Sequence, residues 1–213
     1  MLTVVLGVIA VAAVLAGADR LTAALAGRRI AHAIGRVLGP GSEPAIRFAG
    51  SSFLLQALAG RFREVAITAA ALRAGEMDFH SLRAELRDVR APVRRLLAAS
   101  ASRIVADALT ATATIPFAAI ARRLAPGLVL TRRGADIAIS GRVLLMPVAG
   151  TLAVTVTGQR ISVVPKVLGV PSLVGFVITV PGLPPEVSIA GLRVCDDGLE
   201  VTVKGEQVNL GSG

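Results

Sequence analysis

Apolar and polar residues alternate along most of the chain beyond Pro44, with the period of two that is typical of β-strands. In the stretch 109–115, for example, leucine, alanine and isoleucine at the odd positions are separated by three threonines. Segments of this kind predict about eight or nine strands, and they include 65–71, 82–87, 109–115, 137–139, 152–156, 161–163, 187–194 and 199–203. Each has one aliphatic and one polar side, so we expect an antiparallel sheet with one dry face.

The last two of these segments are joined by Asp196, Asp197 and Gly198, a sequence typical of a hairpin turn. We therefore expect 187–194 and 199–203 to pair as an antiparallel hairpin. A role in this turn is also a better explanation for the adjacent Asp196 and Asp197 than a role as a catalytic carboxylate pair.

The stretch 48–62 interrupts the alternation. Phe48 reads as the end of a strand, Ser52 as a helix cap and Gly60 as a helix stop, after which another strand begins. Gln56 is the only polar residue of the predicted helix, which is otherwise apolar on every side. Such a helix has to be buried in protein, in bound lipid or at a membrane.

Two further short helices are predicted at 92–99 and 116–124, each with a proline at its first position. Together with 52–59 they would cover the dry face of the sheet. The six aromatic residues are all phenylalanine, and the other apolar residues are mostly small and aliphatic. A long curved sheet over so little bulk is expected to leave interior volume unfilled.

An apolar segment punctuated by proline and glycine spans 165–185, with Lys166 as its only charge before Pro185. Its prolines predict loop and edge-strand pieces. A loop with so many apolar residues is poorly suited to exposure to solvent. We expect the segment either in the core or as an apolar lip through which a lipid tail enters.

Residues 1–18 are predicted to be a signal peptide or a membrane anchor. The run from Leu2 to Ala18 is uncharged, and Ala16-Gly17-Ala18 fits a signal-peptidase site. We favour export across the cytoplasmic membrane, to a periplasmic or membrane-anchored position in the cell envelope. The basic residues follow the run instead of preceding it, so a cytoplasmic domain with an N-terminal anchor is the alternative.

Residues 19–39 are predicted to form an amphipathic helix that packs on the domain or links to it. Alternatively, the basic side of this helix rests on anionic lipid headgroups. Residues 40–213 are then predicted to form a single domain.

The net charge of +9 comes mainly from scattered arginines, including the doublets at 28–29, 94–95, 122–123 and 132–133. A dispersed basic surface suits an anionic membrane. Nucleic acid is disfavoured because there is no basic reading helix, zinc-finger spacing or cluster of stacking aromatics. The single cysteine, Cys195, excludes an internal disulfide and a thiolate metal cluster.

No catalytic motif is present: the sequence has no phosphate-binding loop, metalloprotease motif, nucleophile elbow or calcium loop. His32 and His80 are the only histidines, and His80 is expected to be a structural side chain in a strand. Without a convergent acid, base and nucleophile, we expect a binding protein with no catalytic residues, metal or cofactor.

Gly50, Phe53, Leu54, Gln56, Gly60 and Phe62 form the pattern Gly-x-x-Phe-Leu-x-Gln-x-x-x-Gly-x-Phe. Further on come the segments 86–92 (LRDVRAP), 113–117 (ATIPF), 181–185 (PGLPP) and 197–199 (DGL). From Ala18 to its end, the chain thereby resembles the LmeA-type phospholipid-binding proteins of the cell envelope of high-GC bacteria. Members usually carry proline before the first phenylalanine of the pattern, where this chain has Ser52.

The resemblance implies an α+β fold in which a curved, largely antiparallel β-sheet wraps around short helices, similar to tubular lipid-binding domains, preceded by an N-terminal apolar helix. It also implies an exported, membrane-associated protein that binds phospholipid, including inositol-type lipids, with a link to lipomannan-type lipoglycan synthesis. No catalytic residues come with it.

We interpret the chain as a non-enzymatic phospholipid-binding module, with lipid transfer as a further role. The predicted acyl-chain groove comprises Phe53, Leu54, Leu58, Phe62, Phe117, Ile120, Leu124, Leu173 and Phe176. The predicted site for an anionic headgroup comprises Arg94, Arg95, Arg122 and Arg123. The alternatives are a scaffold for an envelope glycosyltransferase, with a filled core and no lipid, and a hydrolase acting on a lipid or glycan.

Overall fold

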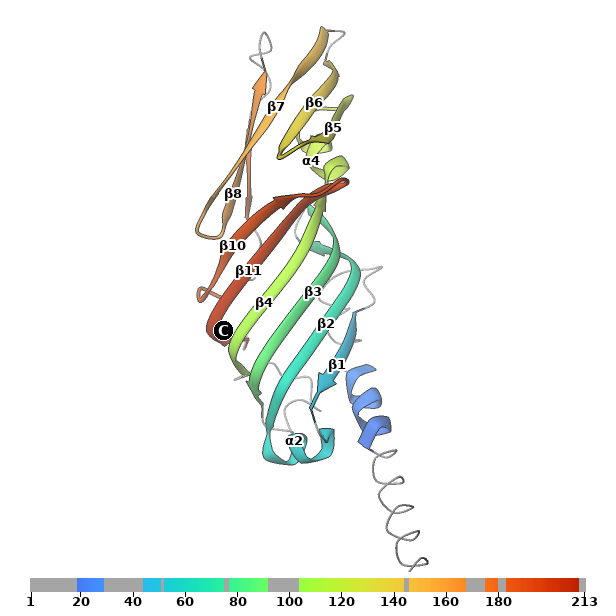
Figure 1. Cartoon of the computed structure of the whole chain (residues 1–213), viewed down its shortest axis with the longest axis vertical. Helices are drawn as coiled ribbons and strands as arrows, with labels where there is room; N and C mark the ends of the chain where they lie inside the picture. Colours follow the sequence, from blue (N-terminus) through green and yellow to red (C-terminus); the bar gives the residue numbers. More distant parts are fainter. Residues whose placement is uncertain are drawn as a thin grey trace, which may run out of the picture.

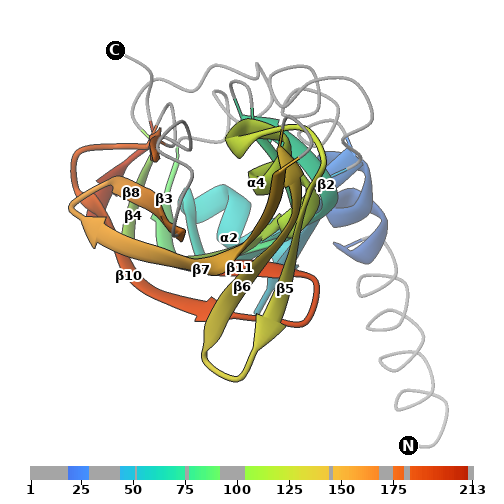
Figure 2. The ribbon, with the colours of Figure 1, turned by 90° about the horizontal axis from the view of Figure 1, so that it is seen from above.

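The computed structural model describes residues 19–28, 44–50, 52–74, 77–91, 104–143, 146–167, 175–179 and 183–210. Two antiparallel sheets follow one another along the long axis of the molecule, with short helices beside and between them (Figure 1). Viewed down this axis, the strands curve around the positions of helices α2 and α4 (Figure 2). Both sheets keep free edge strands.

The six-stranded sheet has the order β1-β2-β3-β4-β11-β10. Its strands are β1 (Ala45–Ala49), β2 (Arg61–Ala74), β3 (Met77–Arg90), β4 (Val105–Pro116), β10 (Val187–Val194) and β11 (Gly198–Asn209). The five-stranded sheet runs in chain order. It consists of β5 (Leu128–Arg133), β6 (Asp136–Val143), β7 (Met146–Thr157), β8 (Arg160–Val167) and β9 (Phe176–Thr179).

The predicted α+β class, with antiparallel strands and short helices, is confirmed, although the strands are divided between two sheets. All eight alternating segments are strands, and β10 and β11 form the predicted hairpin. Three strands lie outside these segments, namely β1, β5 and β9, and all three are at sheet edges. β1 ends at Ala49, next to the strand end predicted at Phe48. These three strands have five, six and four residues, which is a short length over which to recognise an alternation. β9 lies within the proline-rich segment, where edge-strand pieces were expected.

Helix α2 (Phe53–Ala59) begins and ends as its sequence predicts. The hydroxyl of Ser52 accepts a hydrogen bond from the Leu55 amide, and Gly60 adopts the left-handed conformation at φ 65°. The amide of Gly60 donates to the Ala57 carbonyl at 3.0 Å. Ala57 is the only buried residue of this helix.

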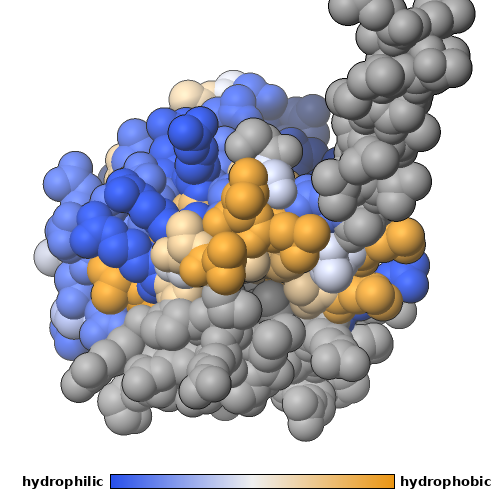
Figure 3. Space-filling model, turned by 90° about the horizontal axis from the view of Figure 1, so that it is seen from below, coloured by the Kyte–Doolittle hydropathy of each residue, from blue (hydrophilic) through white to orange (hydrophobic). Residues whose placement is uncertain are grey.

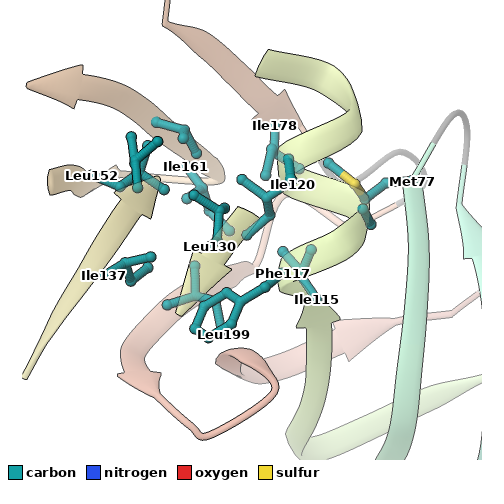
Figure 4. Close-up of a cluster of buried hydrophobic side chains, with 14 of the residues drawn as sticks. Met77, Ile115, Phe117, Ile120, Leu130, Ile137, Leu152, Ile161, Ile178 and Leu199 are labelled. Carbon is teal, nitrogen blue, oxygen red and sulfur yellow. The ribbon is translucent and has the colours of Figure 1, made fainter. Parts of the chain in front are cut away.

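Helix α4 (Phe117–Leu124) joins the two sheets. Its apolar side is buried, while Arg122 and Arg123 are exposed on its last turn. It packs into the upper core, a cluster that also contains Ile115 and Leu199 from the six-stranded sheet and Ile137 from the five-stranded sheet (Figure 4). The helix predicted at 92–99 lies outside the described residues.

The lower core is a second buried cluster, in the half of the six-stranded sheet nearer α2. It contains Ala57, Phe62, Val65, Leu86, Val89, Ala106, Leu109, Val187 and Val208. The dry face predicted from the alternation is therefore packed at two separate levels.

Residues 19–28 are helical and fall within the helix predicted at 19–39. Gly27 is buried against β1, since a Cβ there would lie 3.0 Å from the Ile46 carbonyl oxygen. Segments 1–18 and 29–43 lie outside the described residues, and the proposed division into 1–18, 19–39 and 40–213 stays a prediction. No helix in the described part of the chain is long and apolar enough to cross a membrane.

Candidate functional site

The region around α2 is held together by the side chain of Gln56. Its Nε2 donates to the carbonyls of Ser52 at 3.2 Å and Ala49 at 3.4 Å, and its Oε1 accepts from the Arg63 amide at 2.9 Å. Gly50 has a φ of 130° and lies so close that a Cβ there would be 2.5 Å from Nε2. Gln56 therefore ties the helix to the strands on both sides of it.

Three phenylalanine rings pack together under α2. The centroid distances are 4.9 Å from Phe48 to Phe53, 5.4 Å from Phe48 to Phe62 and 5.8 Å from Phe53 to Phe62. Phe62 is 1% exposed and belongs to the lower core. These contacts fix one side of α2 against the sheet.

The other side of α2 is open. Leu54, Leu55 and Leu58 are 43%, 67% and 86% exposed. Seen from the α2 end, hydrophobic side chains gather on this surface beside more polar ones (Figure 3). The structure thus resolves the question raised by the all-apolar helix: α2 buries one side and exposes the leucines of the other.

Asp19 anchors the N-terminal helix to α2. One carboxylate oxygen accepts from the Ser52 hydroxyl at 2.8 Å and the Leu54 amide at 2.7 Å, and the other accepts from the Phe53 amide at 2.9 Å. The Phe53 and Leu54 amides belong to the first helical turn, where amides have no partner within the helix and attract an anion. The amides of Leu54 and Phe53, and then the Ser52 hydroxyl, lower the pKa of Asp19, although desolvation opposes them.

This lowered pKa predicts how the contact depends on pH. The Asp19 contact should stabilise the fold above the ordinary aspartate pKa of about 3.9 and be lost as the pH falls through the lowered value. In an NMR titration, the amide protons of Phe53 and Leu54 should shift with a midpoint below about 3.9. Asp19→Asn should remove this transition, and a midpoint at the ordinary value would contradict the contact.

An uninterrupted row of aliphatic residues crosses the inner face of the six-stranded sheet between the two cores. Strand pairing places these residues side by side, and we call them the aliphatic row: Ile46, Ile67, Ala84, Ala111, Val203 and Ile189. All six are partly exposed. Five of them also pack against a core: Ile46, Ile67 and Ala84 against the lower core, Ile189 against the upper core and Val203 against both. The adjacent row toward α2 is better buried: only Phe48 is partly exposed, and the other members are buried, namely Val65, Leu86, Leu109, Gly205 and Val187.

The opposite face of the sheet is polar at the same level. Glu85, Thr110, Lys204 and Ser188 pair successively across four strands, and all are exposed. The aliphatic row therefore belongs to the dry face, yet it is less well covered than the cores on either side. Two of its members, Ala84 and Ala111, have small side chains.

At the upper core, the two described arginines predicted to bind a headgroup contact neighbouring side chains. Arg122 forms a 3.0 Å ion pair with Asp78, with the two side chains 70% and 37% exposed. The Arg123 guanidinium lies over the Phe176 ring, 5.6 Å from its centroid. Both arginines remain on an exposed surface beside α4.

The polar and charged side chains of the described residues are at least partly exposed. Among these residues, no group of three His, Cys, Asp or Glu residues could hold a metal ion. His80 is exposed on β3, consistent with its predicted strand position.

Comparison with known families agrees with these apolar surfaces. The model of the LmeA-like phospholipid-binding family matches residues 17–204. The chain belongs to this family. No curated protein and no solved structure matches it.

In this member of the LmeA-like family, the structure explains the motif of residues 50–62. Gly50 makes room for Gln56, Gly60 ends the helix, and Phe53 and Phe62 pack its inner side. Ser52 caps the helix and also donates to Asp19. The pattern therefore builds and orients α2.

The structure divides the predicted acyl-chain residues into two groups. Phe53, Leu54, Leu58 and Phe62 lie at α2, whereas Phe117, Ile120, Leu124 and Phe176 lie in or against the upper core. They do not form one continuous surface. Leu173, Arg94 and Arg95 lie outside the described residues.

The aliphatic row was not among the predicted site residues. Its sequence signal is the use of alanine at inward positions such as Ala84 and Ala111, where a filled core would favour larger side chains. That signal is weak in a chain rich in alanine throughout. Recognising the row required the strand register, which aligns residues from six strands.

Proposed function

We propose that this protein is a non-enzymatic phospholipid-binding protein of the cell envelope, exported across the cytoplasmic membrane, that holds an acyl chain against the aliphatic row. The observation that carries the proposal is a band of six partly exposed aliphatic residues between two closed cores. Its membership of a phospholipid-binding family supports lipid as the occupant.

The dimensions and energetics of the row are suitable for an acyl chain. Strands lie about 4.8 Å apart, so six strands span about 24 Å, while one leaflet of a bilayer's hydrocarbon core is about 15 Å thick. Each methylene transferred from water to an apolar surface contributes about 0.8 kcal/mol. A tail can therefore be held without a polar recognition site along its length.

The headgroup is proposed to be anionic, with inositol-type phospholipid included. The net charge of +9 supports this choice, as does the exposed position of Arg122 and Arg123. By family resemblance, we further propose that the bound lipid is exchanged with a membrane surface and that this exchange supports lipoglycan synthesis. Neither step requires the protein to make or break a covalent bond.

The test is native mass spectrometry of the full chain, purified from membranes in mild detergent. We expect a protein–lipid complex that releases an intact phospholipid on collisional activation. Lipid-free protein from such membranes would overturn the proposal and favour a scaffold with a filled core. Release of a lysophospholipid or free headgroup would instead indicate a hydrolase.

A further inference from the structure

The α2 tip, which we define as Leu54, Leu55 and Leu58, is the most exposed apolar feature near the N-terminal helix. Leu21 and Leu25 of that helix are also 67% and 57% exposed. Five of the nine large apolar side chains that are exposed in the described residues thus belong to these two helices. Concentrated exposure of this kind marks an interaction surface.

Chain connectivity indicates the partner. The uncharged run from Leu2 to Ala18 ends at the residue before Asp19. The Asp19 carboxylate, in turn, binds Ser52, Phe53 and Leu54 at 2.7–2.9 Å. An apolar segment placed in a bilayer would therefore bring the first turn of α2 to the bilayer surface.

Charged residues near the tip suit the same partner. Arg20 follows Asp19 directly, and Arg61 and Arg63 lie at the start of β2, just beyond α2. All three are exposed, and Arg61 forms a 3.0 Å ion pair with Asp88. Basic residues around an apolar surface favour anionic lipid headgroups over other apolar partners. A second protein copy would bring the same positive charges together and be repelled.

We propose that the α2 tip inserts its leucines into an anionic lipid bilayer and so orients the protein on the membrane. This inference deepens the membrane association in the proposed function by naming the surface that makes it. It does not require an acyl chain to occupy the aliphatic row, so the two proposals fail separately.

The chain contains no tryptophan, so single-tryptophan variants can report on the tip. Leu58→Trp should be reconstituted as the full chain in phosphatidylcholine–phosphatidylglycerol vesicles with brominated acyl chains. We expect its fluorescence to shift to the blue and to be quenched several-fold relative to non-brominated vesicles. Leu55→Trp serves as the second variant should Leu58→Trp fold poorly.

The matched control is Val129→Trp, because Val129 is 56% exposed on β5 of the other sheet. Its emission should remain that of a water-exposed tryptophan in the same vesicles. Unquenched emission at position 58, or a blue shift without quenching, would overturn the proposal; the latter result would mean that protein covers the tip. Quenching in a protein that carries no copurified phospholipid would support membrane insertion of the α2 tip and overturn the proposed function.

Discussion

Replacing Ala111 with phenylalanine is expected to reduce copurifying phospholipid about tenfold or more. Ala111 lies on β4 in the middle of the aliphatic row, paired with Ala84 on β3 and Val203 on β11. A benzyl group there would occupy the space proposed for the acyl chain. Displacing two or three methylenes costs about 2 kcal/mol, which exceeds a tenfold change in affinity. Native mass spectrometry gives the lipid-bound fraction.

Thr110→Phe is the matched control, because Thr110 is the adjacent residue on the exposed face of the same strand. It should leave the lipid-bound fraction unchanged. Urea denaturation of Ala111→Phe distinguishes an open row from a filled one. An open row tolerates the larger side chain, whereas overpacking a filled core costs about 1–3 kcal/mol. Wild-type lipid content in a folded Ala111→Phe protein would exclude the row as the acyl-chain site.

Replacing Phe62 with alanine is expected to lower the free energy of unfolding by about 3–5 kcal/mol. Phe62 is 1% exposed, and its ring packs against both Phe48 and Phe53. Its removal would leave a cavity in the lower core and loosen the inner side of α2. Denaturation in urea, with the lipid-bound fraction recorded in parallel, measures the effect.

Leu58→Ala provides the comparison. Leu58 lies on α2, the helix whose inner side packs against Phe62, but it is 86% exposed. Its stability should change by no more than about 0.5 kcal/mol. The sequence predicted that both Phe62 and Leu58 line the acyl-chain groove, whereas the structure buries Phe62 and exposes Leu58. If Phe62→Ala lost lipid without losing stability, the nominated role would hold and the core assignment would be wrong.

Local features of the fold were predicted well because neighbouring residues produce them. Ser52 and Gly60 cap α2 through contacts within a few residues, and the turn at Asp196–Gly198 joins β10 to β11. The inward and outward sides of the inner strands followed from alternation alone. Edge strands and the division into two sheets were less predictable, because they depend on which strands pair.

The candidate site depended on contacts between distant parts of the chain. Asp19 meets Ser52 across 33 positions of sequence, and no local pattern indicates that contact. The aliphatic row joins residues from position 46 to position 203, so it exists only once six strands have a fixed register. Exposure of the α2 leucines likewise depends on where the phenylalanines of three segments pack.

The sequence by itself determined the antiparallel β-rich class, the capped apolar helix, the terminal hairpin and the resemblance to a phospholipid-binding family. These follow from periodicity, from local hydrogen bonds and from a compact motif. Only the tertiary structure decided that α2 exposes three leucines beside the N-terminal helix, and that six partly exposed aliphatic residues form a row between two cores. The reason is that exposure is a property of what packs against a residue, and the packing partners here come from remote strands.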